Sequence, residues 1–199
     1  MISLGIRVAR GDVITFLDDD MHSPVRLKVT RDVFQSNPSL IYYHSNVSVI
    51  DESNKLIHDE MVERTNIPRE VVANNSEEKL NALESYGLCL GLKPSAMAVR
   101  RSFIAKWINV IRLFPKLVDV LIYLLTIINE GSILHDPRRL TYYRVSEANI
   151  SGVRLVKDPM TRFTKAVKNS ARHALARHML VTLAKHVRLG SYVGSMRQR

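Results

Sequence analysis

The segment that most constrains the fold is a short run of β-branched and aromatic residues that ends in three consecutive aspartates. Residues 12–17 read Asp-Val-Ile-Thr-Phe-Leu, and Asp18, Asp19 and Asp20 follow directly. A nearly continuous apolar run of this length is typical of a strand buried on both faces, as in a parallel sheet. The carboxyl ends of such strands line the ligand crevice of an open α/β sheet, so the aspartates are expected there.

The three aspartates indicate a metal site. Alternation along the strand places Asp18 and Asp20 on one face and Asp19 on the other. Carboxylates packed together raise one another's pKa, and a divalent cation removes that repulsion. Mg²⁺ or Mn²⁺ is typically held by one or two protein carboxylates together with substrate phosphates. The segment therefore predicts a metal-bridged diphosphate site, and the alternative is a solvated acidic turn, because a bare Asp-x-Asp is common.

Helix and strand signals alternate along the rest of the chain. Helices are expected at residues 3–10, from Ser23-Pro24 to Asn37-Pro38, from Ser76 onward, from Ser102 to Pro115, and over 116–129 with a stop at Gly131. Strands are expected at 40–50, 56–58, 96–99 and 139–145. The polar segment 59–75 is expected to be a mobile loop.

Length and charge divide the chain into two parts. The 199 residues suit one domain with a sizeable core, and a single cysteine, Cys89, excludes an internal disulfide framework. Residues 150–199 contain 11 lysines and arginines against one acid, so they carry the whole net charge of +10. We therefore expect a domain over residues 1–155 and a basic amphipathic helical tail over residues 156–199.

The tail has two readings. An apolar face opposite a cationic face suits an interfacial helix on an anionic membrane, and it equally suits a helix docked on the domain with its basic face solvated. Nucleic acid is not expected as a partner, because only Phe163 and Tyr192 could stack on bases and no binding motif is present. With no signal peptide and no apolar stretch near the ~20 residues of a spanning helix, we expect a cytoplasmic protein with peripheral contact at the inner face of the membrane.

The acidic strand also carries a family resemblance. Gly5, then Ala9-Arg10-Gly11, then Phe16-Leu17-Asp18-Asp19-Asp20 resembles the DXD region of the family 2 glycosyltransferases. Further along, residues 95–101 are similar to that family's S-x-x-x-x-R-R segment. Asp119 on an apolar helix and residues 140–144 (Leu-Thr-Tyr-Tyr-Arg) follow its closing pattern. The match runs in order over residues 3–151, and it is specific for the family but not for a substrate.

The resemblance implies a fold and a reaction. The fold would be of the GT-A type, a Rossmann-like, mostly parallel sheet flanked by helices, incomplete at the N-terminus because the family places two to three strands before the helix at residues 3–10. The reaction would be metal-dependent transfer of a sugar from a nucleotide-sugar donor to a hydroxyl of a glycan or lipid-linked acceptor, with inversion. The alternative is a non-catalytic remnant or a binding module that attaches to an anionic membrane or polyanion through its tail.

The resemblance also implies residue roles. The donor would contact Asp18, Asp19 and Arg10, and Mg²⁺ or Mn²⁺ would bind Asp20 and Asp18. The acceptor side would hold Arg100, Arg101 and Arg144. Asp119 would be the general base, and it has a physical case of its own: apolar neighbours desolvate a carboxylate and raise its pKa toward the range useful for a base. The alternative for Asp119 is an acid in a first helical turn, favoured by the helix dipole.

Three positions depart from the family pattern. Ser3 stands where an asparagine is usual, Met21 where a further acid often follows, and Ser146 where a histidine often lies near the diphosphate. No Q-x-x-R-W motif is present, so a processive synthase is not expected.

Overall fold

The computed structural model describes residues 2–114 and 117–146, and the predicted tail over residues 156–199 lies outside them. The strands are β1 Val13–Thr15, β2 Met21–His22, β3 Leu40–Ile50, β4 Leu56–Ile57, β5 Val71–Ala73, β6 Met97–Arg100 and β7 Ser132–Arg144. The helices are α1 Ile2–Val8, α2 Arg26–Ser36, α3 Glu60–Glu63, α4 Ser76–Tyr86, α5 Arg101–Ile104, α6 Ile108–Ile111 and α7 Val118–Ile127. Three 3-10 turns are η1 Cys89–Gly91, η2 Pro94–Ala96 and η3 Ala105–Trp107.

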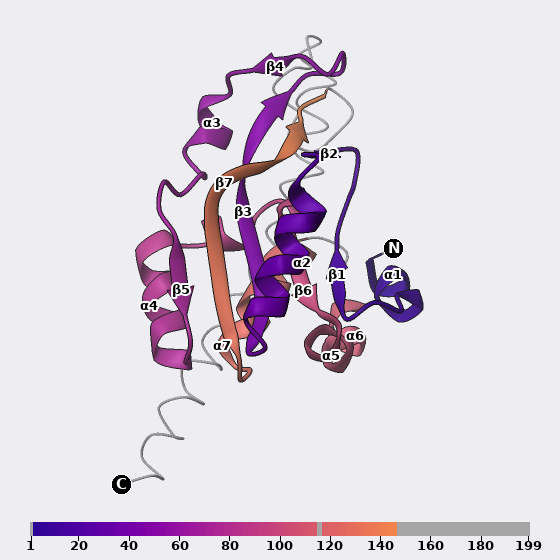
Figure 1. Cartoon of the computed structure of the whole chain (residues 1–199), viewed down its shortest axis with the longest axis vertical. Helices are drawn as coiled ribbons and strands as arrows, with labels where there is room; N and C mark the ends of the chain where they lie inside the picture. Colours follow the sequence, from indigo (N-terminus) through magenta and orange to yellow (C-terminus); the bar gives the residue numbers. More distant parts are fainter. Residues whose placement is uncertain (1, 115–116, 147–199) are drawn as a thin grey trace, which may run out of the picture.

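The strands form one sheet in the order β1-β6-β3-β7-β2, with β4 paired to β3 and β5 paired to β7 (Figure 1). In the part of the chain described, β3 and β7 pair in parallel and the other pairs are antiparallel. The predicted α/β class with helices on the sheet is confirmed, while the sheet is mixed rather than mostly parallel. The expected strand over residues 12–17 shortens to β1, in which only Ile14 is buried, because β1 pairs with β6 alone and lies at an edge of the described sheet.

Helices cover both faces of β3. Successive side chains of a strand point to opposite faces, and Tyr42 and Tyr43 accordingly enter different cores. Tyr42 lies in the large core beneath α4, α6 and α7, whereas Tyr43 packs with Phe34 of α2 on the other face. This double cover explains why nearly every residue of β3 is buried. No helix within the described ranges is both long and apolar enough to cross a bilayer.

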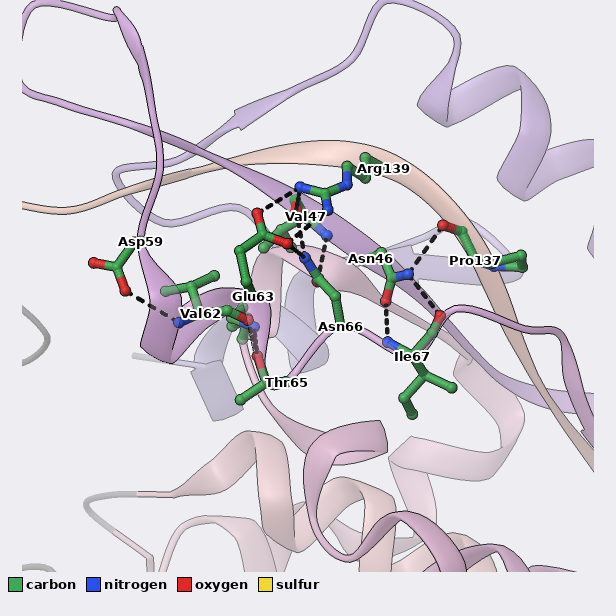
Figure 2. Close-up of polar contacts among 11 residues, drawn as sticks. Asn46, Val47, Asp59, Val62, Glu63, Thr65, Asn66, Ile67, Pro137 and Arg139 are labelled. Carbon is green, nitrogen blue, oxygen red and sulfur yellow. Dashed lines mark hydrogen bonds and ion pairs between the residues drawn. The ribbon is translucent and has the colours of Figure 1, made fainter.

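The segment expected to be a mobile loop is instead held against the sheet. Its first part forms α3, where Asp59 accepts a hydrogen bond from Val62 N at 3.1 Å and so caps the helix. Its last part adds β5 to the edge of β7. Between them, the Glu63 carboxylate pairs with both terminal nitrogens of Arg139, at 2.7 and 2.6 Å, as Figure 2 shows. The expectation was wrong because long-range polar contacts, rather than an apolar pattern, order this segment.

Two asparagines, Asn46 and Asn66, also hold this segment to the sheet, and we call them the asparagine clasp (Figure 2). Asn46 Oδ1 accepts from Ile67 N at 2.9 Å, and its amide donates to Ile67 O at 2.7 Å. Asn66 binds Val47 in the same way: its Oδ1 accepts from Val47 N at 3.1 Å, and its amide donates to Val47 O at 3.0 Å. The register of β3 against β7 shifts on either side of Asn46. The Asn66 side-chain amide therefore supplies hydrogen-bond partners to the Val47 backbone at the point where the pairing of β3 with β7 is irregular.

A buried histidine pair also joins β3 to β7. His44 and His135 face each other across the two strands with their Nδ1 atoms 3.0 Å apart, and His44 Nε2 lies 2.9 Å from Leu92 O. His135 Nε2 lies farther from its carbonyl, Ile67 O, at 3.3 Å. Two neutral rings carry two protons for these three contacts. One of the three contacts therefore lacks a proton.

We expect Asn46→Ala to lower the free energy of unfolding by about 1–3 kcal/mol, because it leaves the buried N–H of Ile67 without a partner. Hydrogen exchange should accelerate over residues 59–70, which lose their attachment to β3. Denaturant unfolding and exchange mass spectrometry measure the two effects. Asn81→Ala, at an exposed position of α4, is the matched control. Unchanged exchange in the Asn46 variant would show that the clasp does not hold the segment.

The histidine pair predicts acid sensitivity. Burial, and next the neighbouring His135, hold the pKa of His44 well below its usual range, and burial also lowers the pKa of His135. A base with a lowered folded pKa gives stability that is complete above its unfolded pKa of about 6.5 and is lost as pH falls below it. The loss approaches about 1.4 kcal/mol per pH unit for each histidine.

Urea unfolding between pH 8 and pH 5 measures that loss. His44→Gln keeps an N–H donor but cannot titrate, so we expect a shallower pH dependence than in the wild type. His58→Gln, at an exposed position, should leave the wild-type slope in place. Equal slopes in the wild type and His44→Gln would remove the pair as the origin of acid sensitivity.

Candidate functional site

The three aspartates form the connection from β1 to β2. Asp18 and Asp19 are exposed, whereas Asp20 is only 8% exposed and its Oδ1 accepts from Arg144 N at 2.8 Å. On the other side, Asp18 N donates to the hydroxyl of the fully buried Ser95 at 3.2 Å. The aspartate loop, residues 18–20, is therefore fixed between η2 and the end of β7.

Arg144 is the main clamp on the aspartate loop. Its Nε donates to Asp19 O at 2.7 Å. Its two terminal nitrogens donate to Asp51 O at 2.9 Å and to Asn54 Oδ1 at 2.7 Å, which belong to the turn between β3 and β4. The sequence predicted Arg144 on the acceptor side. The structure places it beside the aspartates, where the guanidinium joins two loops.

Burial and neighbouring charge affect Asp20 in the same sense. Burial raises its pKa above the usual range, and the negative charges of Asp19 and Asp18 raise it further, against lowering by Ser95 and the Arg144 backbone N–H. An adjacent cation would offset this cost. Asp18 and Asp20 offer oxygen ligands suited to Mg²⁺ or Mn²⁺. Among the described residues, no three His, Cys, Asp or Glu side chains gather as a metal site, so phosphates and water would have to complete the coordination.

Asp119 lies in the first turn of α7. Residues 120–127 of this helix are buried, and the buried Lys79 caps its C-terminal end by donating to Thr126 O and Asn129 O at 3.0 and 2.7 Å. At the other end, Asp119 Oδ2 accepts from Lys93 N at 3.1 Å. Burial raises the pKa of Asp119, while backbone N–H groups and the Lys93 charge lower it. A desolvated carboxylate of this kind has the character of a general base.

Lys93 lies between the two carboxylate positions, and no sequence pattern indicated this role. Burial lowers the pKa of its ammonium to about 8, against raising by Cys89 and by the charges of Glu63, Asp20 and Asp119. The segment that follows supplies Ser95 to the aspartate loop. The structure thus brings the predicted metal ligand and the predicted base to one region. A lysine before a proline has no motif that could have indicated this.

The other predicted basic residues lie elsewhere. β6 runs antiparallel to β1, so Ser95, just before β6, touches Asp18 whereas Arg100 at its end pairs with Val13. The Arg100 guanidinium donates to Leu40 O at 2.8 Å and stacks on Phe34, which anchors the end of α2. Arg101 and Asp12 line a hollow of about 350 Å³ at this far end, together with Arg100, Ser102 and Ala105.

Arg10 is exposed and precedes β1, so the structure does not bring it to the aspartates either. The substrate roles assigned to Arg10, Arg100 and Arg101 stay predictions.

Comparison with known proteins adds a fold-level likeness. No protein-family model matches the sequence, and no curated protein is significantly similar to it. A solved structure, residues 1–349 of TarS from S. aureus, a glycosyltransferase, is similar with a TM-score of 0.50 and 14% identity. The match covers 77% of this chain and 42% of the TarS chain, so this chain spans less than half the length of that neighbour. The likeness shows that this chain shares its fold with part of the TarS structure.

We expect Arg144→Met to loosen the aspartate loop, because three donors to two loops are lost. The free energy of unfolding should fall by about 1–3 kcal/mol, and amide exchange should rise at residues 18–22 and 51–55. Arg101→Met removes an exposed arginine as the matched control. Exchange confined to one of the two loops would mean that Arg144 does not couple them.

Proposed function

We propose that this chain is a GT-A-type glycosyltransferase of family 2 that transfers a sugar from a nucleotide-sugar donor to an acceptor hydroxyl. The observation that carries the proposal is that one short segment contacts both carboxylate positions, on a fold shared with a glycosyltransferase: the Lys93 N–H binds Asp119, and the Ser95 hydroxyl binds the Asp18 N–H of the aspartate loop. One end of this site offers oxygen ligands for a metal–diphosphate, and the other offers a desolvated base. A glycosyl transfer with a diphosphate leaving group needs both.

The proposed reaction assigns each group one task. The exposed Asp18 and Asp19 would contact the nucleotide, and Asp18 and Asp20 would hold Mg²⁺ or Mn²⁺. The metal, when bound, would neutralise charge on the departing diphosphate. Asp119 would accept the proton of the acceptor hydroxyl while that oxygen attacks the anomeric carbon. The bond from this carbon to the diphosphate oxygen breaks on the opposite face, so the sugar inverts its configuration.

The remaining predictions from the sequence extend the proposal to an acceptor and a membrane surface. A glycan or a lipid-linked molecule would supply the hydroxyl, and the basic tail would bring the protein to an anionic membrane surface. Neither partner is needed for the first test, because hydrolysis of the donor by water reports the same bond cleavage.

The test is release of nucleoside diphosphate by the full chain from a panel of nucleotide sugars with Mn²⁺. Asp119→Asn should lower turnover by about 10²–10⁴-fold with little change in donor affinity, since it removes only the base. Asp20→Asn should abolish Mn²⁺-dependent donor binding in calorimetry. Asp32→Asn, at a partly exposed acid of α2 that pairs with Arg31, should match the wild type. Turnover that survives in both site variants would contradict the proposal.

A further inference from the structure

Lys93 presents its ammonium between neutral groups rather than to a carboxylate. Its Nζ donates to Thr65 Oγ1 and lies 5.8 Å from the centre of the Tyr143 ring. In the part of the chain described, no carboxylate forms an ion pair with Lys93, although Cys89 and the charges of Glu63, Asp20 and Asp119 act on it from farther away. A desolvated cation without a direct anionic partner is costly, and an anion brought between these groups would offset that cost.

The backbone of Lys93 has a strained conformation, and this conformation lets Lys93 contact Asp119. Its φ of 65° and ψ of 95° put a side-chain-bearing residue in the region that glycine favours, immediately before Pro94. Such conformations cost about 1–3 kcal/mol and persist only where the surroundings impose them. Here the backbone turns its N–H to Asp119 while the following residues reach the aspartate loop. A glycine would adopt this conformation without strain but would supply no ammonium.

The residues around Lys93 indicate what kind of anion it could bind. A carboxylate metabolite alone would be repelled by Asp18, Asp19 and Asp20. The charges of Asp18 and Asp19 are close enough to this place to raise the pKa of Asp20. A diphosphate that carries a divalent cation presents positive charge to the aspartates and negative oxygens to the lysine. Lysine binds phosphate as a point charge, and its flexible stem tolerates a shift between ground and transition states.

We propose that the Lys93 ammonium binds the diphosphate of the donor and stabilises the charge that develops on it as the glycosidic bond breaks. This role rests on the proposed function above. Lys93 would then oppose the metal across the diphosphate, and its backbone N–H would position Asp119 for the acceptor. One residue would in this way join donor binding to the placement of the base.

Calorimetric titration of the full chain with inorganic pyrophosphate and Mn²⁺ tests the proposal without a choice of base or sugar. Lys93→Met should weaken pyrophosphate binding by at least about tenfold, which corresponds to about 1.4 kcal/mol. Lys93→Arg should retain most of the affinity. Lys106→Met removes an exposed lysine as the matched control. Circular dichroism melting verifies folding, and Lys93→Gly relieves the backbone strain where the methionine variant is unstable.

A pH profile separates binding from a purely structural role. The pKa of Lys93 is lowered to about 8, so the free protein loses the ammonium as pH rises above that value. Pyrophosphate affinity of the wild type should fall above about pH 8 relative to Lys93→Arg, whose guanidinium stays charged. Superimposable profiles for these two proteins would overturn the lysine's role.

The outcomes distinguish the two proposals. A wild type that binds neither pyrophosphate nor any nucleotide sugar with Mn²⁺ contradicts the proposed function itself. A wild type that binds while Lys93→Met and Lys93→Gly bind equally well leaves the function standing and refutes the role of Lys93. Equal weakening by Lys106→Met assigns the effect to overall charge and refutes it too.

Discussion

The parallel pairing of β3 with β7 holds together the parts of this molecule that matter for chemistry. It runs from Leu40 opposite Ser132 to Ile50 opposite Arg144, through the buried histidine pair and the asparagine clasp. Its far end delivers Arg144 to the aspartate loop and to the turn after β3. Because α7 leads directly into β7, the same pairing also places Asp119. A shift of register by one residue would turn every side chain of β7 to the other face, and the site would come apart.

Periodicity and turn chemistry predicted the elements whose order is local. The strand over residues 40–50 was predicted with its observed bounds, because a run rich in β-branched and aromatic residues between turn signals indicates a strand. Gly131 was predicted to stop the apolar helix. It has a φ of 104°, and a Cβ there would lie 2.5 Å from Ile41 Cγ2. By contrast, β7 begins at Ser132 rather than at residue 139, because its first half buries Ser132, His135 and Asp136, whose partners include Ser39, His44 and Tyr43 on a distant segment.

At the candidate site, the chemical type of a residue was a better guide to its location than its place in a short sequence motif. Asp20 was singled out as one of three carboxylates at the end of a strand and Asp119 as an acid in apolar surroundings, and burial raises the pKa of each. Arg100 was assigned by its place in a short motif, yet a motif does not say at which end of a strand a residue will lie. The antiparallel course of β6 carries it away from the aspartates. Lys93 escaped notice because its position depends on a strained backbone conformation and on contacts from three distant segments.

Burial is the common cause of opposite pKa shifts in the acids and the lysine of the candidate site. Burial raises the pKa of Asp20 and Asp119 and lowers that of Lys93, so each group is desolvated while charged partners lie near it but not against it. In a purely structural network these charges would gain by closing into ion pairs, as Arg139 and Glu63 do. Lys93 instead binds a hydroxyl and faces an aromatic ring. Separated charges of both signs complement a ligand that itself carries both, and a metal-bound diphosphate is such a ligand.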